Sequence, residues 1–275
     1  MKEQHCADWQ EFKKKIEAFR TEYRMSDMAQ KKDRPSTLCF RGQASERWPL
    51  ETTLERAGHR EMTFRKYAQL MTVIYPEIST VTNRTFPVPS YAEFDAWMSK
   101  AEKESYVPIG APPGYEFMVY LRQHGYPSPL LDWTDSEYIA AYFAFADTPQ
   151  GDPPHRVAIY GFVERPGFSK ISSVVAPAIV GAGPFVKSHP RHFTQQARYT
   201  YCLKYDEQWK YVSQQLVFDS DPASLTNHQD VLYKFTLPAS EKCEVMKELH
   251  RFNITAWTLF QTEESLMKTM AFKTM

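Results

Sequence analysis

Residues 123–146 read QHGYPSPLLDWTDSEYIAAYFAFA, and this stretch decides the fold. Gly125 can end a helix in the left-handed conformation, and the prolines that follow impose an extended path. Leu130 to Trp133 predicts a short buried strand, and Thr134 is expected to open a second helix whose alanines predict close packing against a sheet. Polar groups gather at the ends of this strand, so we expect a site there.

The composition predicts a globular protein without a dominant charge. Of the 275 residues 43% are hydrophobic, and 33 basic residues balance 33 acidic ones, so nucleic-acid binding would need a local basic patch. The four cysteines are widely spaced and the N-terminus has no apolar signal core, which favours reduced thiols in a cytoplasmic protein. No run approaches the roughly 20 apolar residues of a membrane helix, so no membrane partner is expected.

The hydrophobic patterns predict one α+β domain over residues 1–275. It would contain an N-terminal helix within residues 1–34 and mixed small sheets in the remainder. Helices are expected at residues 6–23, 61–78, 90–101, 115–124, 134–144, 239–252 and 263–272. Strands are expected at residues 37–40, 130–133, 157–163, 171–179, 199–203, 216–218, 231–237 and 256–260.

A first candidate motif, Arg41-Gly42-Gln43, follows a short predicted strand. A guanidinium can grip a phosphate with two hydrogen bonds, and a glycine lets a planar ligand approach the backbone closely. The alternative is an arginine paired with a carboxylate in an ordinary turn. On the tripeptide alone that interpretation is favoured, because Arg-Gly is a common pair.

The second group of candidates surrounds the central strand. Asp132 lies on an otherwise apolar strand, and a buried carboxylate needs a partner, which Arg41 or a backbone amide could supply. His124 could act as an acid or base, or could simply be stabilised by the C-terminal end of its helix. Thr134 could cap the next helix, and Trp133 could fill the core.

A third candidate, Gln195, lies in a basic segment at residues 187–198. An amide cannot act as a general base, but it can orient a ribose hydroxyl by donating and accepting at once. The chain has no Gly-x-Ser-x-Gly elbow, no phosphate-binding P-loop and no His-Glu-x-x-His pattern. We therefore expect no metal and no serine-hydrolase triad.

Taken together, four segments resemble the bacterial FRG domain, in the right order over residues 38–272. They are Phe40-Arg41-Gly42-Gln43, residues 123–134, Ala141-Tyr142-Phe143-Ala144, and Arg191 with Gln195-Gln196. The chain departs from the family pattern at Pro129, where the family usually has arginine, and at Ala197, where it usually has glycine.

The FRG pattern is in turn similar to the Arg-Ser-Glu class of ADP-ribosyltransferases, which implies an ADP-ribosyltransferase-like core and NAD as substrate. By this resemblance Arg41 would hold the pyrophosphate and the Gly42 backbone the nicotinamide carboxamide. Thr134 and Asp132 would support the nicotinamide ribose. Gln43 and Trp133 would complete the NAD contacts. Gln195 lies where the class usually places a glutamate, so Asp132 or His124 would have to serve as the base.

The resemblance implies a bacterial toxin or anti-phage effector that modifies a macromolecule, with RNA favoured over DNA or protein and with a neutralising antitoxin as a further partner. Two alternatives stay open. One is a catalytically silent module that binds a nucleotide or nucleic acid. The other is an NAD-independent nuclease or hydrolase that uses Asp132 and His124.

Overall fold

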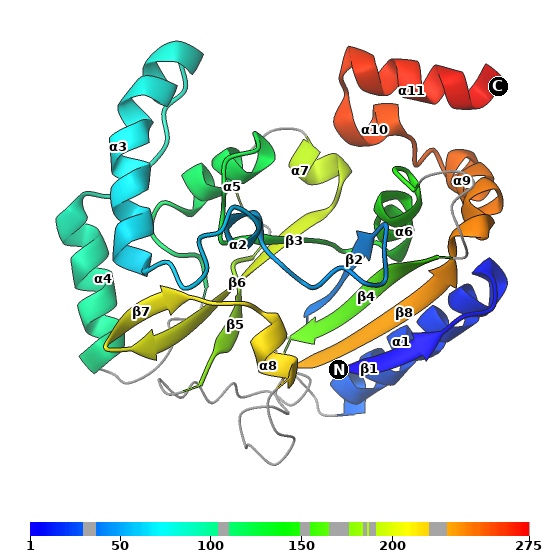
Figure 1. The fold of residues 1–275 in the computed structure, drawn as a ribbon, viewed down its shortest axis with the longest axis horizontal. Coiled ribbons are helices and arrows are strands. Elements are labelled where there is room, and N and C mark those ends of the chain that lie inside the picture. Colours follow the sequence, from blue (N-terminus) through cyan, green and yellow to red (C-terminus); the bar gives the residue numbers. More distant parts are fainter. Residues whose placement is uncertain are drawn as a thin grey trace.

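The strands form one mixed sheet in the computed structural model, which describes residues 1–29, 37–103, 110–148, 155–164, 176–183, 186, 191–219 and 230–274. The sheet runs in the order β1-β8-β4-β2-β3-β6-β5, with β7 paired to β6 (Figure 1). Only β1 and β8 pair in parallel among the described strands. The strands are β1 (Lys2–His5), β2 (Thr37–Gln43), β3 (Leu131–Thr134), β4 (Arg156–Glu164), β5 (Ala178–Gly181), β6 (Ala197–Asp206), β7 (Gln208–Tyr211) and β8 (Val231–Pro238). The chain is thus α+β as expected, but with one sheet in place of several small ones.

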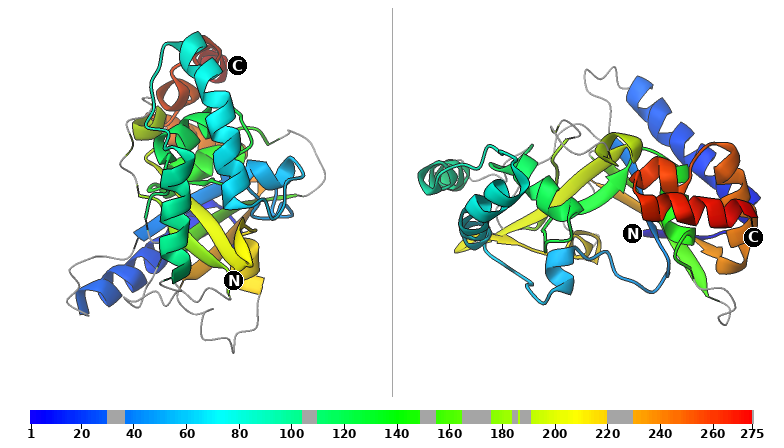
Figure 2. Two further views of the ribbon diagram at one scale, coloured as in Figure 1. Left: turned by 90° about the vertical axis from the view of Figure 1, so that its left-hand side faces the viewer. Right: turned by 90° about the horizontal axis from the view of Figure 1, so that it is seen from above.

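Helices pack along this sheet and beyond its two ends (Figure 1). Figures 1 and 2 show α3 and α4 at the opposite end of the molecule from α10 and α11. The helices are α1 (Trp9–Ala29), α2 (Thr53–Arg56), α3 (Phe64–Thr82), α4 (Tyr91–Lys103), α5 (Tyr115–Gln123), α6 (Glu137–Phe145), α7 (Arg191–Thr194), α8 (Gln215–Asp219), α9 (Lys242–Arg251), α10 (Ala256–Phe260) and α11 (Glu263–Thr274).

Three apolar clusters hold the helices to the sheet. The first joins α1, α6 and α9 to β4 and β8, and Phe19 of α1 packs against Phe40, Tyr233 and Phe235 within it. The second joins α3, α4 and α5 to β5, β6 and β7. The third, which contains Trp133, lies on the face of the sheet opposite the first two. Strands β2 and β3 therefore run between the two groups of helices.

Three local predictions are wrong. Thr134 ends β3, and the N-cap of α6 is Ser136, whose hydroxyl accepts from the amide of Ile139 at 3.3 Å. Residues 216–218 and 256–260, expected as strands, lie in helices α8 and α10. Of the strand expected at residues 171–179, positions 171–175 lie outside the described residues.

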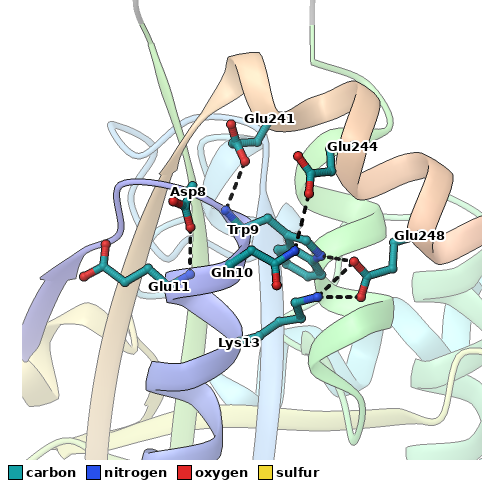
Figure 3. Close-up of polar contacts among 8 residues, drawn as sticks. All are labelled: Asp8, Trp9, Gln10, Glu11, Lys13, Glu241, Glu244 and Glu248. Atoms are coloured by element: carbon teal, nitrogen blue, oxygen red, sulfur yellow. Dashed lines mark hydrogen bonds and ion pairs between the residues drawn. The ribbon is translucent and has the colours of Figure 1, made fainter.

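Polar contacts fasten the start of α1 to α9 (Figure 3). Glu248 accepts from Trp9 Nε1 at 3.0 Å and from Lys13 Nζ at 2.8 and 2.9 Å. Glu241, just before α9, accepts from the Trp9 backbone amide at 3.0 Å, and Asp8 accepts from the amide of Glu11 as a helix cap. The N-terminal helix is thus joined to the C-terminal part of the chain.

None of the helices that the structure describes combines the length and the apolar content required to cross a bilayer.

Candidate functional site

The sheet opens between β2 and β3. Strand β2 pairs with β4 along its whole length, but it pairs with β3 at one position, where Phe40 lies opposite Thr134. Beyond Phe40 the two strands diverge. Because alternate residues of a strand direct their backbone groups to opposite sides, part of the β2 backbone after Phe40 faces this gap.

Arg41 bridges the gap between the strands. Its Nη1 donates to the backbone carbonyl of Asp132 at 2.8 Å, and its buried Nε has no hydrogen-bond partner among the described residues. Burial lowers the pKa of Arg41 to about 10. The Asp132 carboxylate opposes this shift, and the positive charges of Arg122 and Arg56 add to it. A bound anion would stabilise the charged guanidinium here.

Gly42 marks the closest approach of β2 to α6. A Cβ atom on this residue would lie 1.8 Å from the carbonyl oxygen of Ala140 and 2.7 Å from the amide nitrogen of Ala144. The close packing predicted from the alanines of α6 is confirmed. Gly42 was predicted for ligand approach, and the structure gives its missing side chain a second reason, since no larger residue fits against this helix.

Asp132 has an arginine partner, although not the expected one. Its Oδ2 forms an ion pair with Nη2 of Arg122, at the end of α5, whereas Arg41 binds the Asp132 backbone. Asp132 Oδ1 and Arg122 Nε are buried and have no partner among the described residues. One wall of the gap therefore carries an unsatisfied acceptor and an unsatisfied donor, and a ligand could satisfy both.

The gap opens into a single hollow of about 770 Å³, which we call the β2–β3 hollow. This volume lies within the roughly 300–1,000 Å³ of small-molecule sites. His124 does not line it; this exposed side chain lies beside Tyr120, with ring centroids 4.4 Å apart. The other predicted site residues all line the hollow: Arg41, Gly42, Gln43, Asp132, Trp133, Thr134 and Gln195.

Two of these residues also support the fold. Trp133 is 4% exposed, and its indole stacks on Phe162 and donates to Thr200 Oγ1 at 2.7 Å. The Thr134 hydroxyl accepts from the amide of Ser136 at 3.2 Å. Trp133 thus packs in the core beside the hollow, while Thr134 fixes the turn into α6.

The two predicted glutamines of the hollow, Gln43 and Gln195, are held by their amide nitrogens. Gln43 Nε2 donates to the carbonyl of Pro49 at 3.2 Å, and Gln195 Nε2 donates to the carbonyl of Leu259 at 3.0 Å. Gln43 Oε1 is buried and without a partner among the described residues. These bonds fix the orientation of both amides, and they leave the Gln43 oxygen as an acceptor for a ligand.

The basic segment is only partly described, because residues 187–190 lie outside the described ranges. Arg198 forms a two-point ion pair with Asp135 at 2.7 and 2.8 Å, and His192 is 2% exposed. Arg191 lines the hollow and donates through Nε to the carbonyl of Phe260 at 3.0 Å. These three side chains are therefore engaged within the protein and do not form an open basic patch.

Sequence reasoning missed several residues that line the hollow. The pattern around His124 points to Arg122, which comes two residues earlier, but the contributions of the other residues depend on the tertiary fold. Trp48 is 54% exposed at this site. The missed residues include Trp48, Glu51, Arg56, Arg122, Asp147, Tyr199 and Phe260, and the hollow is also lined by Phe143 and Arg191, which carried the family resemblance without a predicted site role.

A possible metal-ligand group lies elsewhere, on the surface. Glu3, His5 and Glu46 each place one potential ligand atom within 4.8 Å of the others. Each already has a partner, since Glu3 pairs with Lys234, His5 bonds to Thr236 and Glu46 lies 3.7 Å from Arg156. We therefore assign no metal to this group.

Residues 36–152 match the family model described as FRG domain. This range includes β2, β3, α5 and α6, which meet at the hollow, whereas Gln195 lies outside it. Comparisons with curated proteins and with solved structures give no significant match. The match supports an FRG domain at residues 36–152 of this chain.

Proposed function

We propose that this protein is an NAD-dependent ADP-ribosyltransferase that moves ADP-ribose onto a macromolecule. The observation that carries the proposal is the convergence of Arg41, Asp132, Thr134 and Gln195 on one hollow. These residues come from β2, β3 and the segment after α7, so their proximity results from the fold. The size of the hollow supports a dinucleotide as ligand.

The chemistry of the hollow suits cleavage of an N-glycosidic bond. The bond between the ribose C1′ and the nicotinamide nitrogen breaks, and its electron pair leaves with nicotinamide. The acceptor's nucleophile then bonds to C1′ and loses a proton. Positive charge develops on the ribose in the transition state, so a fixed carboxylate lowers the barrier. Asp132, with Oδ1 buried and unpartnered among the described residues, would supply that charge and accept the proton.

The remaining residues would position NAD. Arg41 keeps donors for the diphosphate beyond the one that it gives to Asp132. Thr134 and Gln195 would hold the hydroxyls of the nicotinamide ribose, and the Gln43 oxygen would accept from the carboxamide. His124 has no part in this proposal because it lies outside the hollow.

RNA is the acceptor that we propose first. Trp48 lines the hollow and is 54% exposed, and Phe193 on α7 is 67% exposed. Exposed aromatic rings can stack on unpaired bases, which RNA presents in its single-stranded regions. An enzyme that modifies cellular RNA would be toxic to its host, so we also propose a role as a toxin or anti-phage effector with a neutralising protein partner.

A silent nucleotide-binding module is the second candidate. It is favoured by Gln195, because an amide stands where the resemblance implies a catalytic glutamate. Such a module would bind NAD in the same hollow without breaking it.

Labelled NAD separates these possibilities. The protein is incubated with total RNA and with NAD labelled in its adenylate part. We expect label on a product that ribonuclease destroys and protease does not, and a loss of at least about 100-fold with Asp132→Asn. Asp95→Asn, which removes a carboxylate from an exposed pair with Arg65, is the matched control. Saturable NAD binding without turnover would favour the silent module, and RNA cleavage without NAD would favour a nuclease.

A further inference from the structure

We propose that Arg56 and Arg122 join Arg41 in an arginine cluster that binds both phosphates of a nucleotide diphosphate. This inference rests on the proposed function for the identity of the nucleotide. It adds two positioning residues that were not among the predicted site residues. Three elements meet in the cluster, since Arg41 comes from β2, Arg56 ends α2 and Arg122 lies at the end of α5, and all three line the hollow.

The charges near the cluster leave it positive. Glu51 lines the hollow, but it is paired with Arg60, which does not. Asp132 is paired with Arg122. Neither Arg41 nor Arg56 has a carboxylate partner among the described residues, so their charges remain uncompensated there. A polyanion would relieve the repulsion between them.

The cluster also has hydrogen-bond donors that no described residue uses. A guanidinium offers five N–H donors in a planar fork. Arg41 gives Nη1 to a backbone carbonyl and Arg122 gives Nη2 to Asp132, while the Nε of each is buried and without a partner among the described residues. Phosphate oxygens match this geometry and can accept from two nitrogens of one fork.

Arg56 reaches the hollow from the end of a short capped helix. Helix α2 begins with a capping box in which Thr52 accepts from the Glu55 amide and Glu55 accepts from the Thr52 amide. The Arg56 residue is exposed, in contrast to the half-buried Arg122. The cluster thus combines two half-buried guanidiniums with an exposed one, all lining the same hollow.

A diphosphate fits this cluster better than a phosphodiester does. Each phosphodiester of RNA carries one negative charge, whereas the diphosphate of NAD or ADP-ribose carries two on adjacent phosphorus atoms. Three neighbouring guanidiniums with one carboxylate leave an excess of two positive charges, which the diphosphate matches.

Binding of ADP-ribose by calorimetry at fixed salt tests the inference without any turnover. Arg56→Gln should weaken ADP-ribose binding about tenfold and AMP binding less than about threefold, because AMP has only one phosphorus atom to contact. Arg65→Gln removes an exposed charge that pairs with Asp95 outside the hollow, and it should change either affinity less than about twofold. Arg122→Gln should weaken ADP-ribose binding at least as much as Arg56→Gln. Arg56→Gln carries the test because this exposed residue can change without unfolding the protein, which thermal unfolding will verify.

Two results would overturn the inference. One is an ADP-ribose affinity that is equal in wild type and Arg56→Gln, or that falls equally in the Arg65→Gln control. The other is a single-stranded dinucleotide that binds more tightly than ADP-ribose and depends on Arg56, because the cluster would then recognise a phosphodiester. Arg56-dependent binding of ADP-ribose without any transfer from NAD would leave the inference standing and contradict the proposed function. Transfer of ADP-ribose together with binding that does not depend on Arg56 would support the proposed function and contradict the inference.

Discussion

Asp132 and Arg122 form an ion pair that links β3 to the end of α5 and sets one wall of the β2–β3 hollow. Because Arg122 also belongs to the arginine cluster, Asp132→Asn should separate binding from chemistry. We expect transfer of ADP-ribose to fall at least about 100-fold, since the negative charge near C1′ is lost. ADP-ribose should bind as tightly as before or a fewfold more tightly, because Arg122 is freed from its carboxylate. Calorimetry and initial rates with labelled NAD measure the two effects.

The same substitution should cost little stability. The Asp132 side chain is 36% exposed, and a partly solvated pair contributes about 0.5–1 kcal/mol. Urea unfolding of Asp132→Asn, Arg122→Gln and the double variant gives the coupling energy of the pair. If transfer by Asp132→Asn matched that of wild type, the carboxylate could not be the stabilising or basic group.

His124 provides a contrasting prediction. Its side chain is exposed beside Tyr120 and lies outside the hollow. His124→Gln should therefore change the rate of transfer less than about twofold between pH 6 and pH 8, although histidine titrates in this range. A loss of tenfold or more, or a changed pH profile, would show that His124 takes part in the reaction and would revive it as the base.

Local patterns predicted some elements well and others poorly. Ser90 and Glu93 form the capping box expected at the start of α4, because both partners lie within one turn. Thr134 was expected to cap α6 in the same way. Instead, Thr134 pairs with Phe40 in the sheet, and Ser136 is the N-cap of α6. Pairing with a distant strand overrode the local preference, and one sequence does not reveal that pairing.

Two short apolar runs, residues 216–218 and 256–260, were predicted as strands but lie in helices. Residues 256–260 are too few to separate a strand from a helix by periodicity, and the Thr255 capping box decides for the helix α10. Edge strand β1 was missed because polar residues dominate it, and β7 was missed because alternation over only four residues is too short to identify a strand. The site residues divide in the same way, into those that local motifs predict and those that only the tertiary fold places. The motif residues of β2 and β3 were predictable, whereas Arg56 and Arg122 reach the hollow from helices whose placement depends on the second apolar cluster and on the loop after β2.

Gly42→Ala should test the contact between β2 and α6. The new methyl group would meet the carbonyl of Ala140 at 1.8 Å, so the strand or the helix must move. We expect a loss of about 2–3 kcal/mol in the free energy of unfolding, as for overpacked cores, and weaker NAD binding because both elements line the hollow. Urea unfolding and calorimetry measure these effects.

Gly58→Ala is the control for Gly42→Ala. Gly58 has φ +85° and open space around its Cβ position, so its cost comes from backbone conformation alone, about 1 kcal/mol. Equal losses in the two variants would contradict the assigned steric role of Gly42.

Glu248 should be the strongest polar link between α1 and α9 (Figure 3). Its carboxylate accepts from Trp9 Nε1 and Lys13 Nζ, and the Trp9 residue is fully buried. Glu248→Ala leaves the indole N–H without its acceptor and should lower the free energy of unfolding by about 1–3 kcal/mol. Glu248→Gln keeps an acceptor oxygen but loses the charge, so its loss should be smaller. Glu244→Ala, which removes one exposed 3.4 Å contact with Gln10, should cost less than about 0.5 kcal/mol. If Glu248→Ala and Glu244→Ala lost equal stability in urea, apolar packing alone would hold α1 against α9.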